Sequence, residues 1–180
     1  FYQAAKEAGI NPVLGCEFYV APVSRRSREV SDKNPYHLIL LARNEVGYHN
    51  LLMLTTEAHL EGFYYRPRVD RELLAEHNEG LVALSACTHG ELPRLILEGR
   101  AEEAREAARW HREVFGDFYL EVQRHDLPEL DQINPELIAM SRELDIPLVA
   151  TNDVHYVQKE DASAHDLLLC IQTNSTIYDE

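Results

Sequence analysis

The feature that most constrains this chain is a regular alternation of short apolar segments with longer amphipathic segments. The apolar segments have the length and composition of strands, and the segments between them have the spacing and capping residues of helices. Nearly continuous apolar strands that alternate with helices predict an α/β fold, in which a mostly parallel sheet is covered by helices on both faces. The predicted strands are residues 13–20, 36–42, 80–86, 118–122 and 146–151, and the predicted helices are 1–9, 44–60, 70–77, 100–115, 128–144 and one starting near 159.

The size and the charge of the chain limit its function. A chain of 180 residues buries roughly 70% of its unfolded surface, which is enough for a core without disulfides. Acidic residues number 31 against 17 Lys and Arg, a net charge of −14. This balance excludes a protein that holds nucleic acid by bulk charge, because such binding needs many clustered Lys and Arg. Contact with DNA therefore requires a local site, bound metal or residues outside this sequence.

The sequence predicts neither a membrane partner nor a secreted protein. Its longest apolar runs fall far short of the roughly 20 residues that span a bilayer, and no signal peptide opens the chain. The three cysteines are scattered and form no CxxC pair, which argues against a disulfide framework. We therefore expect a cytoplasmic protein. Because the chain begins at Phe1, within what is predicted to be a helix, we also expect a piece of a longer protein.

Candidate metal ligands occur on or near the predicted strands. Glu17 lies in the first strand, His37 opens the second, and Cys87 ends the third, while Asp153 and His155 follow the fifth. Chemistry in α/β folds is concentrated at the carboxyl ends of strands. Carboxylate, imidazole and thiolate together are typical of a zinc or manganese site. In an extended segment, residues two apart project to the same side, so the last two residues are expected to share one cluster.

Each of these residues also has a structural explanation. Cys87 could be a small core residue, His37 an ordinary satisfied histidine, and Asp153 the cap of a turn. Glu17 is harder to explain in this way, because a buried carboxylate within an apolar strand must be paired or coordinated. The prediction of a metal site therefore depends on all five candidates falling on one sheet.

Longer motifs in the chain carry a family resemblance. They are GCEFYV (15–20), YHLILLA (36–42), EGFYYRPR (61–68), LSAC (84–87), ATNDVHY (150–156) and HDLLLCIQT (165–173). These motifs resemble the PHP (polymerase and histidinol phosphatase) domain of bacterial replicative DNA polymerase III alpha subunits. The resemblance covers residues 1–180 in order and identifies one PHP-like domain that is truncated at both ends.

The resemblance implies a distorted (β/α)7 barrel with a cluster of metal ions at the carboxyl ends of its strands. Glu17, His37, Cys87, Asp153 and His155 match metal-ligand positions of the family, whereas two further histidines near strand ends, at 89 and 125, match none. The family's His-x-His and Asp-His-Gly motifs, which belong to the first two strands, are absent. We therefore expect an incomplete barrel of about five mainly parallel strands with part of the ligand set.

The resemblance also implies metal-dependent phosphodiester hydrolysis, which in the polymerases is a 3′–5′ proofreading exonuclease. Divalent metal ions would clamp the phosphate and lower the pKa of a bound water. Cys87 favours zinc, with manganese or iron as alternatives. The implied partners are DNA, the other domains and subunits of the replicative polymerase, and a separate proofreading exonuclease subunit. The piece alone is expected to be inactive.

Two other functions remain open at this stage. Members of the family that have lost ligands serve as structural modules, which stabilise the polymerase and dock a separate proofreading subunit. A small-molecule phosphatase has the same fold and ligands. The five unsubstituted ligand positions favour the enzyme. Arg66 and Arg68, in the aromatic turn 62–68, are candidates for contacting a phosphate backbone, although loop arginines are more often simply solvated.

Overall fold

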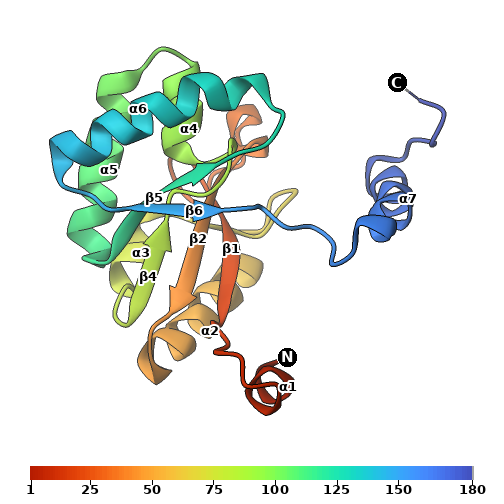
Figure 1. Ribbon diagram of the computed structural model, residues 1–180. Helices are drawn as coiled ribbons and strands as arrows, with labels where there is room; N and C mark the ends of the chain where they lie inside the picture. The colour runs from red at the N-terminus through yellow and green to blue at the C-terminus, as the bar shows by residue number, and fades with distance from the viewer. Residues whose placement is uncertain (180) are drawn as a thin grey trace.

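The computed structural model describes residues 1–179, apart from the side chain of Ser31, as an open α/β sheet with helices (Figure 1). The strands are β1 (Gly15–Val20), β2 (Tyr36–Ala42), β3 (Arg68–Val69), β4 (Leu81–Leu84), β5 (Phe118–Gln123) and β6 (Leu148–Thr151). The helices are α1 (Tyr2–Glu7), α2 (Glu45–Leu60), α3 (Arg71–Glu76), α4 (Glu91–Leu97), α5 (Ala101–Phe115), α6 (Pro128–Leu144) and α7 (Ala162–Thr173), with 3-10 turns at Val30–Lys33 and Lys159–Asp161.

The sheet has the strand order β3-β1-β2-β4-β5-β6 and does not close into a barrel. Strand β2 runs antiparallel to its neighbours β1 and β4, and the other neighbouring pairs are parallel. The expectation of a mainly parallel sheet is therefore confirmed. The start of β2 lies at the edge where the other strands end, because the register pairs His37 with Tyr19 near the end of β1. This reversal brings His37 to the predicted functional edge.

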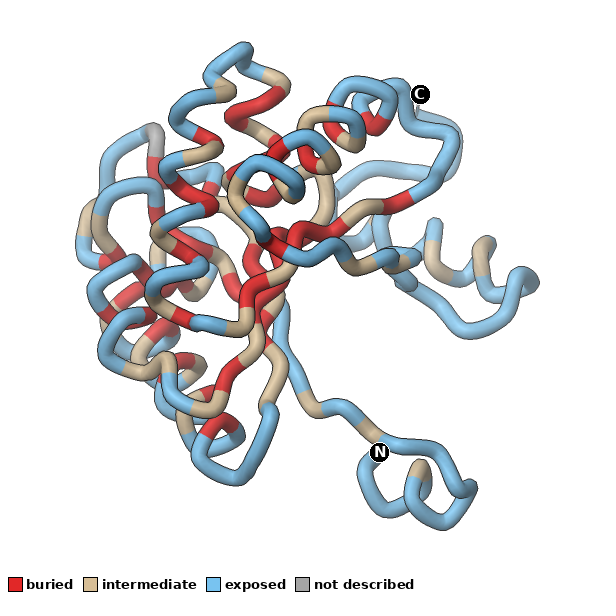
Figure 2. The backbone as a smooth tube through the Cα atoms, turned by 60° about the vertical axis from the view of Figure 1, so that its left-hand side comes forward, coloured by how far each residue is buried: buried red, intermediate tan, exposed pale blue. Residues whose placement is uncertain are grey.

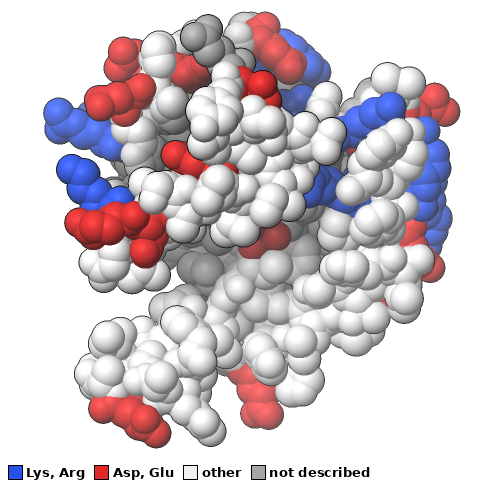
Figure 3. Space-filling view, turned by 90° about the vertical axis from the view of Figure 1, so that its right-hand side faces the viewer, with Lys and Arg blue, Asp and Glu red and all other residues white. Residues whose placement is uncertain are grey.

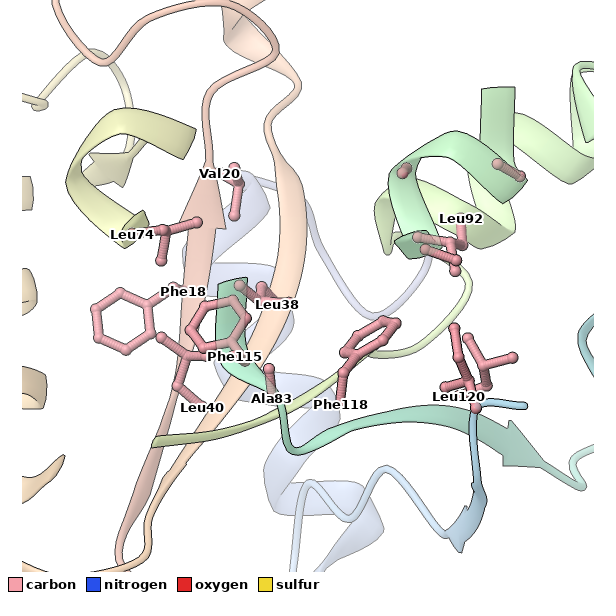
Figure 4. Packing of buried hydrophobic residues seen from close by; sticks show 14 of the residues in the cluster. Phe18, Val20, Leu38, Leu40, Leu74, Ala83, Leu92, Phe115, Phe118 and Leu120 are labelled. Carbon is pink, nitrogen blue, oxygen red and sulfur yellow. The ribbon is translucent and has the colours of Figure 1, made fainter. Parts of the chain in front are cut away.

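Helices cover only one face of the sheet in the described part of the chain. Phe18 and Leu38 project into a core that helices α2 to α6 line, and Figure 4 shows them among buried side chains from α3, α4 and α5. The alternate residues Tyr19, His37 and Ile39 lie on the opposite face and are only half-buried. The expectation of helices on both faces is thus wrong, since a run of apolar residues does not reveal which face lacks a cover.

Capping residues fix the starts of two helices as predicted. The side chain of Asn44 accepts a hydrogen bond from Gly47 N (3.0 Å) at the start of α2, and that of Asp70 accepts one from Leu73 N (3.1 Å) at the start of α3. Helix α2 also approaches the start of β4 closely, since a Cβ at Gly47 would lie 1.9 Å from the carbonyl oxygen of Gly80. A larger residue at this position would push the helix off the sheet.

The two ends of the chain lie apart from this body (Figures 1 and 2). Neither α1 nor α7 has a buried residue, and α7 follows an extended segment that leads away from β6. Helix α7 carries exposed Leu167, Leu168 and Ile171. Within residues 1–179, no helix combines the length and apolar character needed to cross a membrane.

Two elements were not predicted from the sequence. Helix α4 starts after Gly90 without a side-chain cap and contains Pro93, so its signals are weak apart from Glu91 in the first turn. Strand β3 has two residues, Arg68 and Val69, which is too short for a periodic pattern. In contrast, β2 and α6 have the predicted boundaries, because Pro35 and Pro128 mark their starts.

Candidate metal centre

Glu17, His37 and Cys87 come together at the edge of the sheet where most strands end. The Nδ1 atom of His37 lies 3.2 Å from Glu17 Oε1 and 3.6 Å from Cys87 Sγ. Glu17 projects from β1, His37 from the start of the antiparallel β2, and Cys87 follows β4. The reversed direction of β2 therefore explains why a residue at the beginning of a strand meets residues from the middle and the end of others.

Glu17 differs from the expectation of a buried carboxylate. Its side chain is 39% exposed and that of His37 is 20% exposed, because both lie on the uncovered face of the sheet. The argument that Glu17 must be paired because it is buried is therefore wrong. Its position beside His37 supports a role in the site instead.

His89 is a member of this cluster that the sequence reasoning did not assign. Its Nδ1 lies 4.0 Å from Cys87 Sγ, and its ring stacks on that of His37 with centroids 5.2 Å apart. Its carbonyl oxygen accepts a hydrogen bond from the backbone N–H of His37 (3.0 Å). The Cys-x-His spacing directly after a strand was the signal that could have identified it. His125, by contrast, is exposed in the loop after β5.

The protonation state of His37 suits metal binding. Burial, followed by the charge of His89, lowers the pKa of His37 to about 4, and the nearby Arg94 and Arg66 add to this effect. The imidazole is therefore neutral at pH 7, and its contact with Glu17 is not an ion pair. A neutral imidazole has a free lone pair, which is the form that binds a metal ion.

The two acidic groups beside His37 both have raised pKa values. Partial burial and then the charge of Asp153 raise the pKa of Glu17. Burial is also the main cause that raises the pKa of Cys87, and the charges of Asp153 and Glu17 add to it. A divalent cation would reverse these effects by stabilising the carboxylate and the thiolate. The chemistry of the donor set therefore fits a divalent metal ion.

The sequence reasoning assumed that the segment with Asp153 and His155 is extended, but the structure shows that it is not. Strand β6 ends at Thr151, and Asp153 adopts the left-handed conformation with φ 48°. The ring Nδ1 of His155 lies 2.7 Å from the carbonyl oxygen of Asp153, and both residues are exposed. The idea that their side chains project together from a strand is wrong. The charge of Asp153 nevertheless reaches Glu17 and Cys87.

The five predicted ligands are thus only partly assembled. Glu17, His37 and Cys87 are in contact, whereas Asp153 and His155 stay at the margin of the cluster. Among residues 1–179, no three His, Cys, Asp or Glu residues are placed closely enough to hold a metal ion.

Unusual backbone conformations mark the same edge of the sheet. Ala86, directly before Cys87, has φ 63°, and Asp153 has φ 48°. Residues other than glycine seldom adopt positive φ angles, and such conformations concentrate at functional sites. Both positions follow the end of a strand, so they turn the chain where candidate ligands are carried.

A buried carboxylate on the neighbouring strands was also missed from the sequence. Glu121 on β5 is 7% exposed. Its Oε1 accepts hydrogen bonds from the hydroxyl of Thr151 and from Gln123 Nε2 (3.1 Å), whereas its Oε2 has no hydrogen-bond partner among the described residues. These contacts tie β5 to the last residue of β6, two positions before Asp153. An isolated Glu in a strand resembles an ordinary exposed residue, so sequence alone did not reveal this cluster.

The two arginines predicted to contact nucleic acid have different environments. Arg66 is exposed, with its guanidinium 5.7 Å from the centroid of the Tyr19 ring. Arg68 is 0% exposed, so the expectation that it reaches a phosphate backbone is corrected. Its guanidinium donates hydrogen bonds within the chain. The acceptors are the carbonyl oxygens of Gly62 (3.0 Å), Arg25 (2.9 Å), Ser27 (2.8 Å) and Asp32 (3.4 Å).

Comparison with known proteins identifies the family. The sequence model described as "PHP domain" matches residues 1–125, a range that includes Glu17, His37 and Cys87. The chain is 51% identical over 183 residues to the DNA polymerase III subunit alpha of Borreliella burgdorferi, with 100% of the chain and 16% of that protein aligned. It is 51% identical over 177 residues to the subunit of the same name from Treponema pallidum, with 96% of the chain and 15% of that protein aligned.

A third relative has the same name, and the chain aligns with a similarly small part of its length. The chain is 45% identical over 183 residues to the DNA polymerase III subunit alpha of Thermus aquaticus, with 99% of the chain and 15% of that protein aligned. The chain therefore spans about one sixth of the length of these relatives. Because the family model covers more than half of the sequence, this chain belongs to the PHP domain family.

Proposed function

We propose that this chain is part of the PHP domain of a bacterial DNA polymerase III alpha subunit, and that the domain hydrolyses phosphodiester bonds as a metal-dependent 3′–5′ exonuclease. Family membership and the names of the relatives support the first part. One observation carries the second part: the neutral imidazole of His37 lies between the carboxylate of Glu17 and the thiol of Cys87.

Glu17, His37 and Cys87 are the residues that would hold the metal ions, with Asp153 and His155 as further ligands from the segment after β6. Bound divalent ions would polarise the phosphodiester and lower the pKa of a water molecule. The thiol of Cys87 favours zinc, and the histidines and carboxylates also suit manganese or iron.

The remaining residues orient the ligands and leave the site accessible. The hydrogen bond from His37 N to the carbonyl oxygen of His89 fixes the start of β2 against the loop after β4. Ring stacking between the same two residues limits how far the His37 imidazole rotates. The uncovered face of the sheet gives an extended substrate access to Glu17 and His37. These features suit the end of a nucleic-acid strand better than a small substrate that must be enclosed.

The proposed substrate is the 3′ end of a DNA strand. The printed name of the relatives describes a subunit of a DNA polymerase, so DNA and the other parts of that polymerase are the proposed partners, in the bacterial cytoplasm. The acidic net charge of −14 does not oppose this proposal, because metal ions and the remaining polymerase would supply the positive charge.

Removal of the metal tests this proposal. A full-length alpha subunit with this segment is incubated with 3′-labelled single-stranded DNA in Mg²⁺ buffer without nucleotides, before and after treatment with a zinc-selective chelator. We expect the chelator to lower nucleotide release by more than about 100-fold, because the clamp on the phosphate and the activated water are lost together. Added zinc or manganese should restore the rate.

A His37→Ala subunit purified in parallel controls for a contaminating exonuclease, since its preparation should release no nucleotide after zinc is added. Equal release by the two proteins would contradict the proposal. Absence of release from the zinc-loaded wild type would favour the other function, a domain that stabilises the polymerase and docks a separate proofreading subunit.

A further inference from the structure

A basic cleft lies directly beside the candidate metal centre. Its volume is about 400 Å³, and Lys33, Arg66 and Arg94 line it together with His37 and His89 of the metal centre. No Asp or Glu is among its lining residues, although acidic residues outnumber Lys and Arg by 31 to 17 in the chain. The cleft and the metal centre therefore form one continuous surface, in which the cleft favours anions and the metal centre favours cations. In the view of Figure 3, Lys and Arg side chains are visible at both the left and the right of the molecule.

In the described part of the chain, the three cations of the cleft have no acidic partner. Among the described residues, no carboxylate lies within ion-pair distance of Lys33, Arg66 or Arg94. Many other arginines of the chain do form ion pairs, for example Arg25 with Asp70. Further ion-paired arginines are Arg26, Arg43, Arg71, Arg100, Arg105, Arg109 and Arg112. The positive charge of the cleft is therefore available to an external anion.

Aromatic rings hold these cations in place. The Nζ atom of Lys33 lies 4.8 Å from the centroid of the Tyr65 ring. The guanidinium of Arg94 lies 4.6 Å from the centroid of Tyr36 and donates a hydrogen bond to the carbonyl oxygen of Asn34 (2.9 Å). Contacts of this kind restrict long side chains without neutralising their charge. The cations are thus oriented before an anion arrives.

The buried Arg68 fixes the two segments that carry Lys33 and Arg66. Its guanidinium joins the carbonyl oxygen of Asp32, directly before Lys33, to that of Gly62, at the start of the turn that presents Arg66. Side chains that are held in this way lose less conformational entropy when they bind, so the affinity for the ligand is higher. The role of Arg68 is therefore to position the cleft, not to contact the anion.

We propose that this cleft binds the phosphodiester next to the one that is cleaved at the metal centre, so that the preferred substrate is a nucleic-acid strand with at least two consecutive phosphodiesters. The inference depends on the proposed function, because it assigns the scissile phosphate to Glu17, His37 and Cys87. His37 and His89 line both parts, which places the two phosphates on one continuous path.

Hydrolysis of two short substrates by the full-length subunit tests this inference. A thymidine dinucleotide has one phosphodiester, whereas a trinucleotide has a second phosphodiester for the cleft. In the wild type, we expect a higher kcat/KM for the trinucleotide. Lys33→Gln and Arg66→Gln should each lower the ratio of trinucleotide to dinucleotide kcat/KM by about tenfold, the usual effect of one charge-assisted contact. Arg26 is an exposed arginine in the loop that carries Lys33, and it does not line the cleft. Arg26→Gln should therefore leave the ratio unchanged.

Binding without hydrolysis separates this inference from the proposed function. A fluorescent trinucleotide is titrated into the chelator-treated subunit, with excess primer–template present to occupy the polymerase site. Lys33→Gln and Arg66→Gln should each raise the Kd by about tenfold, and Arg26→Gln should not. Inorganic phosphate and thymidine monophosphate should compete only weakly, because neither contains a phosphodiester.

The outcomes of the two experiments are distinct. If the trinucleotide binds in a manner that depends on Lys33 and Arg66 but no substrate is hydrolysed, the proposed function fails and the cleft proposal stands. If hydrolysis occurs and the ratio is the same in the wild type and the cleft variants, the cleft proposal is overturned. Strong competition by inorganic phosphate would also overturn it, because it would indicate a site for a free or terminal phosphate.

Discussion

Replacing His37 with alanine in the full-length subunit is expected to lower 3′ nucleotide release by more than about 100-fold, because loss of a direct ligand exceeds the 10- to 100-fold effect of residues behind the ligands. The expected effect is large because the Nδ1 atom of His37 contacts both Glu17 (3.2 Å) and Cys87 (3.6 Å). Cys87→Ala should have a similar effect. The rate is measured on 3′-labelled DNA with zinc present.

The control for this substitution is His49→Ala. His49 is exposed on α2, where its ring lies beside the carbonyl oxygen of Glu45 and the ring of Tyr48, so its loss should not change the rate. His37→Ala should also keep the fold, because His37 lies on the uncovered face of the sheet and outside the core. A rate within tenfold of the wild type for His37→Ala would contradict a catalytic role for this cluster.

Arg68→Met is expected to give the largest loss of stability, about 3–5 kcal/mol in the free energy of unfolding. The substitution keeps an unbranched side chain but removes the hydrogen bonds that the guanidinium donates to the carbonyl oxygens of residues 25, 27, 32 and 62. Arg28 and the backbone N–H of residue 68 still donate to three of these oxygens, whereas the oxygen of Asp32 loses its donor. Buried carbonyl groups that lose a hydrogen bond retain the full cost of desolvation. Unfolding of the chain in urea provides the measurement.

Arg66→Met is the matched comparison, because it changes the same residue type two positions earlier in the same turn. Arg66 is exposed, so the free energy of unfolding should change by no more than about 0.5 kcal/mol. Similar values for the two variants would show that the loop network around Arg68 does not stabilise the fold.

This pair of arginines also shows a limit of sequence reasoning. Arg66 and Arg68 lie in one aromatic turn and have the same local signals, yet one is exposed and the other is 0% exposed. The difference arises from loop 22–35, which folds over the turn and supplies three of the four carbonyl acceptors. Contacts between segments so far apart in the chain leave no trace in a local pattern.

The strands and most helices could be predicted because their signals are local. Strand β2 follows Pro35, helix α6 begins at Pro128, and both carry long apolar patterns. Asn44 and Asp70 cap helices as expected. The antiparallel direction of β2 was predictable in principle, since no helix that could serve as a parallel crossover lies between β1 and β2. The uncovered face was not predictable, because Ile39 and Leu40 are equally apolar but project to opposite sides.

The candidate site was predictable in part for the same reason. Cys87 could be placed at the functional edge because it follows the end of a strand. His37 opens β2 and reaches the same edge because β2 runs antiparallel to its neighbours, a direction that the predicted parallel sheet did not include. Asp153 could not be placed correctly, since a left-handed conformation at a residue other than glycine has no reliable sequence signal. His89 was recognised near a strand end but not assigned to the site, because its contact with His37 depends on the loop after β4.

The most direct test of the central claim is the metal content of the full-length subunit, measured by elemental mass spectrometry after extensive dialysis. The variant in which Cys87 and His37 are both replaced by alanine is the reference. The cluster proposed at Glu17, His37 and Cys87 predicts about two to three metal ions per wild-type chain, zinc foremost, and their loss from the variant. A wild-type protein with no more metal than the variant would contradict the claim.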